Sequence, residues 1–362
     1  MRILELNFER GWRGGERQTL YCMRQFRRAG HDVSLMARRG GKIAAVARAE
    51  GFNVIEQAGP AGQAAYLMAS GNHFDIIHAQ TANTITWAAL TRWRHRRPVV
   101  FSRRTDFHVR HDARTRFKWR HVDWFVAISE SAAAEPRRLG LAPSIIRSAI
   151  EPVSVDDARV ARFVEEFGLH GKRLIGTSAA LVDDKDPLTM IRAVHRLAGQ
   201  RDDFVFVHLG GGGDAEPAAR ALVDELGLQK VYLFAGFQSD VESLYSIMDV
   251  FAMSSVEEAL GSSVLDAFLQ RVPVVSTDAG GLKESLADGR GVLCRARDHE
   301  AMAEGMRRML DDAGFRDAAV ERAYDYVRRE HDVVEMGRRY LEGFERLGSK
   351  TERRRGPSGI KR

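Results

Sequence analysis

Short apolar runs rich in β-branched residues alternate with helix-like segments along this chain of 362 residues, and the series occurs twice. Strand, helix and strand at this spacing predict a parallel sheet, because the crossover between parallel strands needs room for a helix. The first series of expected strands comprises Ile3–Phe8, Asp32–Met36, Asn53–Glu56, Phe74–His78, Pro98–Ser102 and Trp124–Ile128. The second comprises Leu174–Ser178, Phe204–Leu209, Val231–Ala235, Asp249–Ser254, Pro273–Thr277 and Gly291–Cys294. We therefore expect an α/β fold with two doubly wound, parallel-sheet, Rossmann-like domains.

The length of the chain favours the same division, since one hydrophobic core seldom serves this many residues. The strand rhythm breaks between about Glu151 and Gly171, which predicts one domain over residues 1–155 and a second over residues 156–330. Ligands of doubly wound sheets bind at the carboxyl ends of the strands. Two such domains facing each other would place the ligand site in the cleft between them.

Cysteine usage and the lack of long apolar runs predict the compartment. Cys22 and Cys294 lie far apart and have neither metal-ligand nor disulfide spacing, as expected in a reducing cytosol. No apolar run approaches the length of a membrane span, and the first residues, Met1–Phe8, lead into a strand and not into a charged and then apolar leader. We expect a cytoplasmic protein that is neither secreted nor membrane-spanning.

The segment Asp249–Glu284 carries the clearest chemical pattern. It holds two strand-like runs and, between them, a helix that begins at Gly261-Ser262-Ser263. The unpaired N–H groups and the positive end of a helix attract phosphate. The carboxylates of Glu258 and Asp266 flank this point, so a diphosphate and sugar hydroxyls could bind side by side. A purely local alternative is that Ser263 and Asp266 form an S-x-x-D capping box.

Glu258 and Asp266 have the spacing of an E-x7-E signature, and Gly280-Gly281-Leu282-Lys283-Glu284 matches a GG-x-x-E loop. On these residues the C-terminal half resembles the retaining, nucleotide-sugar-dependent glycosyltransferases of family 4, which have the two-domain GT-B fold. The resemblance implies that Glu258 contacts hydroxyls of the donor sugar and that position 266 contacts the ribose. Asp266 is one methylene shorter than the glutamate of the family, which predicts a weaker ribose contact or a shifted helix.

The same resemblance implies further donor-binding positions. Gly14 and Gly15 match a loop that approaches the donor phosphates and the acceptor, although a plain tight turn explains a glycine pair equally well. Gly236 and Phe237 match a G-F/Y loop whose backbone reads the nucleobase. The run Gly210–Gly213 is similar to the G-x-G loop of these enzymes, but glycine richness alone is weak support.

Lys185 matches the lysine of an R-L-x-x-x-K pattern that neutralises the donor diphosphate, while Ala180 stands where that pattern has arginine. The alternative for Lys185 is an ordinary solvated lysine. The resemblance assigns catalysis to Glu258 and Lys185. The amides at Gly261, Ser262 and Ser263 would help to stabilise the leaving diphosphate, where negative charge grows in the transition state.

No cofactor beyond the nucleotide-sugar substrate is expected. His108 and His111 have no further ligand at a useful spacing, so we expect no metal. In the GT-B enzymes that the chain resembles, the last helix crosses back onto the first domain, and we expect the same of residues 331–347. Residues 348–362 are charged and empty of core residues, which predicts a basic disordered tail.

The strongest charge asymmetry lies between Arg92 and His121, with eleven Arg or Lys and four His against two Asp, interleaved with aromatic residues. Such a patch suits anionic lipid headgroups and a phosphorylated lipid acceptor, or nucleic acid. Because it falls in the half that binds acceptors in the family, we favour an anionic glycolipid on the inner face of the cell membrane and expect no nucleic acid. An ordinary solvated basic surface is the alternative.

Within this patch, Arg103 and Arg104 stand where many family members carry a histidine. They could stabilise the departing diphosphate or hold an anionic acceptor, since guanidinium groups match phosphate oxygens. A solvated pair at a strand end would be the structural alternative. We predict both arginines as acceptor-binding residues.

Together these patterns predict a hexosyltransferase-type enzyme that moves a sugar from a nucleotide-sugar to an anionic membrane glycolipid, such as a lipopolysaccharide core, with retention of anomeric configuration. Two alternatives stay open: a sugar-nucleotide epimerase or phosphorylase on the same fold, and a non-catalytic basic protein that binds anions or lipids.

Overall fold

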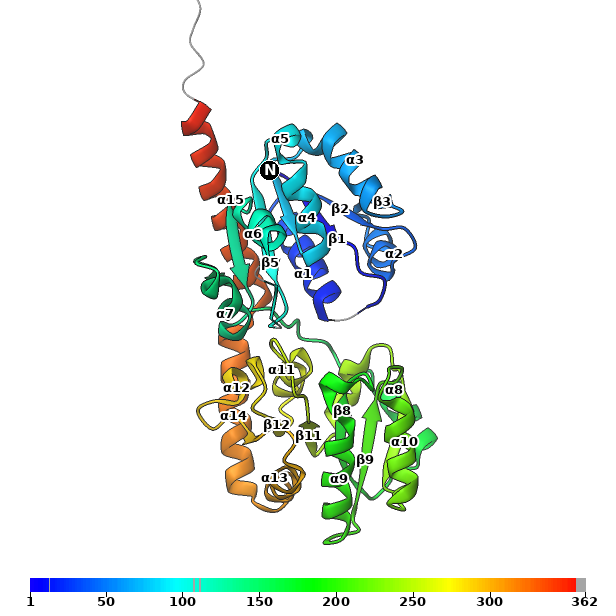
Figure 1. Cartoon of the computed structure of the whole chain (residues 1–362). Helices are drawn as coiled ribbons and strands as arrows, with labels where there is room; N and C mark the ends of the chain where they lie inside the picture. The colour runs from blue at the N-terminus through cyan, green and yellow to red at the C-terminus, as the bar shows by residue number, and fades with distance from the viewer. Residues whose placement is uncertain (13, 107, 111, 356–362) are drawn as a thin grey trace, which may run out of the picture. The chain divides into compact units, whose positions relative to one another are not determined.

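A computed structural model describes residues 1–12, 14–106, 108–110 and 112–355. The chain forms two compact units (Figure 1). The N-terminal unit consists of Met1–Ala149 together with Asp332–Arg362, and the C-terminal unit consists of Ile150–His331. The last long helix therefore belongs to the unit that contains the start of the chain.

The N-terminal unit is built on a seven-stranded parallel sheet with the order β3-β2-β1-β4-β5-β6-β7. The strands are β1 (Arg2–Asn7), β2 (Asp32–Arg38), β3 (Asn53–Gln57), β4 (Ile76–Ala79), β5 (Val99–Arg103), β6 (Trp124–Ala127) and β7 (Ser144–Ile145). The helices are α1 (Gly14–Arg28), α2 (Lys42–Ala49), α3 (Pro60–Ser70), the 3-10 helix η1 (Gly71–His73), α4 (Ala82–Leu90), α5 (Arg92–His95), α6 (Ala113–Arg120), α7 (Glu130–Arg138) and α15 (Val333–Arg355).

The C-terminal unit has a six-stranded parallel sheet with the order β10-β9-β8-β11-β12-β13. Its strands are β8 (Arg173–Ser178), β9 (Phe204–Leu209), β10 (Tyr232–Gly236), β11 (Val250–Met253), β12 (Val274–Thr277) and β13 (Val292–Cys294). Its helices are α8 (Asp157–Phe167), η2 (Asp183–Lys185), α9 (Pro187–Ala198), α10 (Glu216–Glu225), η3 (Val241–Ile247), α11 (Ser262–Leu269), α12 (Gly281–Leu286), α13 (His299–Asp311) and α14 (Ala313–Glu330).

Alternating side chains of the central strands bury both faces of the N-terminal sheet. On β1, Ile3 packs into a cluster with α1, α2 and α15, while Leu4 packs into a second cluster with α3, α4 and α6. In α15, Met336, Tyr340 and Phe344 recur at helical spacing and are buried, and the ring of Phe344 lies 5.3 Å from that of Phe26. This apolar face attaches the end of the chain to the N-terminal unit.

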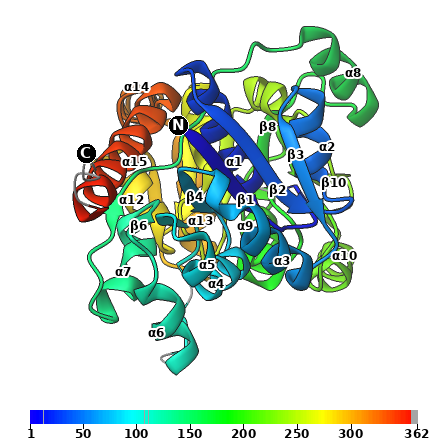
Figure 2. The ribbon, with the colours of Figure 1, turned by 90° about the horizontal axis from the view of Figure 1, so that it is seen from above.

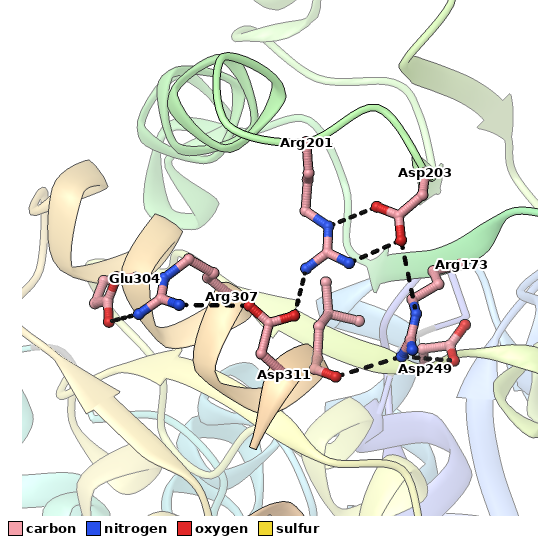
Figure 3. A network of polar contacts seen from close by, with 8 residues as sticks. Arg173, Arg201, Asp203, Asp249, Glu304, Arg307 and Asp311 are labelled. Atoms are coloured by element: carbon pink, nitrogen blue, oxygen red, sulfur yellow. Dashed lines mark hydrogen bonds and ion pairs between the residues drawn. The ribbon is translucent and has the colours of Figure 1, made fainter. Parts of the chain in front are cut away.

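Charged residues tie together the amino ends of the strands in the C-terminal unit (Figure 3). Arg201, in the turn before β9, bonds both carboxylate oxygens of Asp203 at 2.6 and 2.8 Å and reaches Asp311 of α13 at 2.9 Å. The hydrogen bonds from Arg201 hold the pKa of Asp203 at about 2. The network lies at the amino ends of the strands. Ligands of parallel sheets bind at the opposite, carboxyl ends.

The fold confirms the expected class of two parallel-sheet Rossmann-like domains, and each of the twelve expected strands corresponds to an observed strand. The sequence missed β7, which has only two residues at the sheet edge. The expected tail is wrong for residues 348–355, because α15 continues to Arg355. Residues 356–362 lie outside the described part of the chain.

Candidate functional site

The candidate site of the C-terminal unit begins at the N-terminal end of α11. The helix is preceded by Gly261, whose φ of +78° is unfavourable for other residues, and a Cβ there would lie 2.4 Å from Leu282 Cδ2. The N-cap of the helix is Gly261 and not Ser263. A capping box that begins at Ser263 is therefore not formed, because that residue already lies inside the helix. The local alternative is therefore wrong, and Ser262 and Ser263 instead form the first turn of the helix.

Lys185 and Glu258, the two predicted catalytic residues, form an ion pair in this unit. Lys185 ends η2, which follows β8, and Glu258 lies in the loop after β11. Their side chains are 25% and 17% exposed, so both charges are partly shielded but still within reach of a ligand. The structure thus brings together residues that are 73 positions apart in the sequence.

Hydrogen bonds to main-chain carbonyls fix the segments that carry this ion pair. Ser254 Oγ donates to the carbonyls of Lys185 at 2.8 Å and of Asp186 at 2.9 Å, and the N–H of Val256 donates to Asp184 O at 2.9 Å. The η2 turn and the loop after β11 are therefore joined on both sides of Lys185. This arrangement orients the lysine without help from the missing arginine at position 180.

The Gly280-Gly281 pair holds the backbone of Glu258. The N–H of Gly281 donates to Glu258 O at 2.7 Å, and a Cβ on Gly281 would lie 2.3 Å from Ala259 O. Gly280 has a φ of +45° and a ψ of −120°. Glycine is required at both positions, since the first needs an unusual backbone conformation and the second allows two backbones to approach.

Arg290 is a residue that sequence reasoning missed. It is buried, and its guanidinium donates to the carbonyls of Glu284 and Ser285, each at 2.7 Å, and to Asp288 at 2.9 Å. These bonds satisfy carbonyls at the C-terminal end of α12, whose first residue holds Glu258. A lone arginine matches no motif, so no signal in the sequence could have indicated this role.

Asp266, the predicted ribose contact, lies in α11 and is buried. The half-buried Ser262 and Ser263 lie one turn earlier. Their amides belong to the first turn, where N–H groups have no acceptor within the helix and the helix dipole is positive. The geometry suits a diphosphate at this helix end, while the ribose contact of Asp266 stays a prediction.

The predicted base-reading loop stands at the carboxyl end of β10. Gly236 has a φ of +65°, and its carbonyl accepts the N–H of Gly210 at 2.7 Å, which joins the two glycine loops. Phe237 is 66% exposed. Beneath these loops, burial lowers the pKa of His208 to about 4, and the ring contacts Tyr232 Oη at 2.8 Å and Ala179 O at 3.1 Å.

The remaining predicted residues lie in the N-terminal unit. Gly14 and Gly15 open α1, and a Cβ on Gly15 would lie 3.8 Å from Arg104 Cδ. Arg103 is only 3% exposed; its Nε donates to Ala132 O at 3.1 Å, and its guanidinium lies over the ring of Trp119. The structure therefore brings Arg104, and not Arg103, beside the glycine loop.

The residues that the structure describes contain no group of three or more His, Cys, Asp or Glu side chains placed to hold a metal, and His111 lies outside them. No helix among them is long and apolar enough to cross a membrane. Burial raises the pKa of both Cys22 and Cys294 to about 12, so neither thiol is a nucleophile at neutral pH.

Comparison with known proteins agrees with this geometry. A family model described as Glycosyltransferase Family 4 matches residues 12–152, and one described as Glycosyl transferases group 1 matches residues 161–326. The lipopolysaccharide core biosynthesis glycosyltransferase LpsE of Rhizobium meliloti is 31% identical over 167 residues, which are 46% of this chain and 42% of that protein. The match thus spans less than half of that relative.

A longer match joins the chain to the lipopolysaccharide core biosynthesis mannosyltransferase LpcC of Rhizobium leguminosarum, with 26% identity over 265 residues, 70% of this chain and 73% of that protein. Among solved structures, HepE of Anabaena in complex with UDP superposes with a TM-score of 0.84 at 18% identity, over 95% of this chain and 100% of that one. At this identity the superposition establishes the fold alone.

Fold and site together define the class: a protein with the GT-B architecture of two parallel-sheet α/β domains, as in nucleotide-sugar glycosyltransferases. Within this class, the chain belongs to glycosyltransferase family 4. The family that the E-x7-E and GG-x-x-E motifs indicated is confirmed.

Proposed function

We propose that this protein transfers a hexosyl group from a nucleotide-sugar to an anionic glycolipid at the inner face of the cell membrane, with retention of anomeric configuration. The observation that carries the proposal is the Lys185–Glu258 pair, held by hydrogen bonds to main-chain carbonyls in the loop before α11. A cation, a carboxylate and unpaired helix amides converge there, which is the set of groups that a sugar diphosphate needs.

In the proposed reaction, the bond between the anomeric carbon and the diphosphate oxygen breaks, and an acceptor oxygen bonds to the anomeric carbon. The acceptor proton passes to the departing phosphate. Lys185 and the first-turn amides of α11 stabilise the charge that develops on the diphosphate, and Glu258 binds sugar hydroxyls. Because these donors are fixed before the reaction, their stabilisation needs no reorganisation in the transition state.

The donor assignment also draws on structural relatives. HepE of Anabaena has been solved in complex with UDP and in complex with UDP-glucose. The GT-B architecture shared with HepE makes a nucleoside-diphosphate sugar the expected donor here. The identity of the base and of the sugar is left to experiment, since the contacts predicted at Gly236 and Phe237 are main-chain contacts.

The surface between Arg92 and His121 supports an acceptor at a membrane. Figure 2 shows α4, α5 and α6 close together at one edge of the N-terminal unit. Leu90, Trp93 and Phe117 are exposed and line a groove of about 610 Å³ there. Arg92 and Arg96 also line this groove. Further exposed arginines of the same stretch of sequence are Arg94, Arg110, Arg114, Arg116 and Arg120. Apolar side chains among basic ones are the combination that binds anionic bilayers. A lipopolysaccharide-core acceptor is proposed from the relatives LpsE and LpcC.

Thermal-shift titration with UDP-, GDP-, ADP- and CMP-sugars, with and without EDTA, tests the donor site first. We expect stabilisation by one nucleotide class, and a shift that survives EDTA would support a metal-independent site. Glu258→Gln and Lys185→Ala should abolish release of nucleoside diphosphate in the presence of anionic glycolipids. Lys230→Ala, which removes an exposed lysine of the same unit, is the matched control.

The outcomes separate the alternatives. Near-normal turnover in Glu258→Gln or Lys185→Ala would refute the proposed mechanism. Donor conversion without any acceptor would favour an epimerase or phosphorylase. No shift with any nucleotide-sugar would favour a non-catalytic protein that binds anionic lipids through its basic surface.

A further inference from the structure

Arg104 is a half-buried cation whose hydrogen-bond partners are all neutral. Its Nε and Nη2 donate to Gln80 Oε1 at 3.0 and 2.7 Å, and its Nη1 donates to Ser148 Oγ at 3.1 Å. Within the described ranges no carboxylate forms an ion pair with it. A guanidinium carries five N–H groups, and the bonds to Gln80 and Ser148 use three of them. The buried thiol of Cys22 also interacts with the guanidinium by a side-chain hydrogen bond, so these neighbours are all uncharged. A half-buried cation without an anionic partner is suited to a phosphate or carboxylate.

A buried relay fixes Gln80. Its Nε2 donates to Glu5 Oε2 at 2.8 Å, so its amide oxygen must face Arg104, which can only donate. The other oxygen of Glu5 contacts His78 Nδ1 at 2.8 Å, and His78 Nε2 contacts Ser102 Oγ at 2.8 Å. Glu5, His78 and Ser102 are fully buried. This relay sets the plane of the guanidinium before any ligand arrives.

A second amide fixes the opposite side of Arg104. Gln18, on α1, is buried and bonds Ala149 twice: its Nε2 donates to Ala149 O at 2.6 Å, and its Oε1 accepts the N–H of Ala149 at 2.8 Å. These two bonds hold the loop segment that presents Ser148 to Arg104. The side chain is thus held from two directions, and its guanidinium is preorganised for binding.

A glycine of the first helix lies beside Arg104 at ordinary contact distance. A Cβ on Gly15 would be 3.8 Å from Arg104 Cδ, and Gly15 belongs to the first turn of α1. Arg103, in contrast, is buried, and its guanidinium contacts Ala132 O and the ring of Trp119. The two neighbours point to opposite sides, as consecutive residues at the end of a strand do.

We propose that Arg104 is an anion-binding residue of the N-terminal unit and that it takes a phosphate group of the acceptor, with Glu5, Gln80 and Gln18 as positioning residues. The identity of the ligand as an acceptor rests on the proposed function, whereas anion binding by Arg104 does not. The same chemistry could instead serve a phosphate of the donor. An experiment that occupies the donor site separately distinguishes the two.

The test is a 31P NMR titration of the full chain with glycerol 3-phosphate, with and without saturating UDP. We expect binding that persists with UDP present and weakens about tenfold or more in Arg104→Gln, as a lost pair of charge-assisted bonds implies. Arg104→Lys keeps the charge but loses the two-point geometry and should weaken binding less. Arg39→Gln removes an exposed arginine of the same unit and should change affinity less than about twofold.

Equal binding by the wild type, Arg104→Gln and Arg104→Lys would overturn the inference. Binding that disappears when UDP is added, and that Lys185→Ala abolishes, would assign the anion site to the donor and overturn the acceptor role. Failure of the proposed function has a different signature: no nucleotide-sugar would stabilise the protein, while Arg104-dependent binding of glycerol 3-phosphate would remain.

Discussion

Replacing Gly281 by alanine tests whether the close approach of α12 to the loop of Glu258 holds that residue in place. The added Cβ would lie 2.3 Å from Ala259 O and 2.7 Å from Leu260 Cα, and real Cβ atoms essentially never come within 3.0 Å of such atoms. Both contacts are with backbone, which cannot rotate away. The two segments must therefore separate by about 0.7 Å even to reach that limit.

The energetic consequence follows from two losses. Overpacking of this kind costs about 1–3 kcal/mol, and weakening the 2.7 Å bond from Gly281 N–H to Glu258 O costs about 1 kcal/mol more. For a unit of this size, that total lowers the melting temperature by roughly 5–10 °C. The shift also displaces Glu258, and a misplacement approaching 1 Å lowers turnover by up to about 100-fold.

The assays are thermal unfolding and release of nucleoside diphosphate. Gly199→Ala is the matched control, because Gly199 has a φ of −71° and a Cβ there would meet only ordinary contacts, the nearest 3.5 Å away. We expect that control to change stability by less than about 1 kcal/mol. If Gly281→Ala melted and turned over like Gly199→Ala, Gly281 would not be holding Glu258.

Arg290→Ala should lower the free energy of unfolding by about 2–4 kcal/mol in urea, because it leaves the carbonyls at the end of α12 without their donor. It should also lower turnover, and wild-type turnover would refute the positioning role of Arg290. His208 has its pKa lowered to about 4 by burial, so it is neutral in the folded state while the unfolded chain takes up a proton below pH 6.5. Stability should therefore fall by up to about 3 kcal/mol from pH 6.5 to pH 4, and His208→Asn should flatten that part of the pH profile, whereas an unchanged slope would contradict it. Trp93→Ala should reduce co-sedimentation with vesicles containing anionic lipid by about tenfold while leaving the soluble fold intact, and equal binding to purely zwitterionic vesicles would contradict the charge argument.

The fold could be read from the sequence because its strands are buried on both faces. Such strands appear as continuous apolar runs, and the longer runs all matched observed strands. The two-residue β7 has no run to detect, since it only extends the sheet edge. The helical segment between β4 and β5 is divided into α4 and α5 at Thr91, whose hydroxyl donates to Trp87 O at 2.7 Å. One residue ends the helix here, and the hydrophobic periodicity of the sequence does not reveal such a local break.

The site was predictable where glycine and carboxylate motifs define it and not where tertiary contacts do. Glu258, Lys185 and Gly280-Gly281 are part of patterns, and the structure brings them together. Arg103 and Arg104 look equivalent in the sequence, but they face opposite sides of the sheet end and only one lies beside the glycine loop. Arg290 bonds main-chain carbonyls, which any sequence supplies, so no spacing could reveal it.

The departures from the family pattern fall on side chains, while the contacts that position Glu258 and Lys185 all end on main-chain carbonyls. Ala180 replaces an arginine and Asp266 a glutamate, yet the bonds from Ser254, Val256 and Gly281 that fix the site end on backbone carbonyls. The bonds from the Val256 and Gly281 N–H groups do not depend on neighbouring side chains, and the bonds from Ser254 depend only on its own hydroxyl. The positions of Lys185 and Glu258 can therefore persist although Ala180 stands where the family has an arginine. Without that arginine, Lys185 is the cation on which we expect diphosphate binding to depend most.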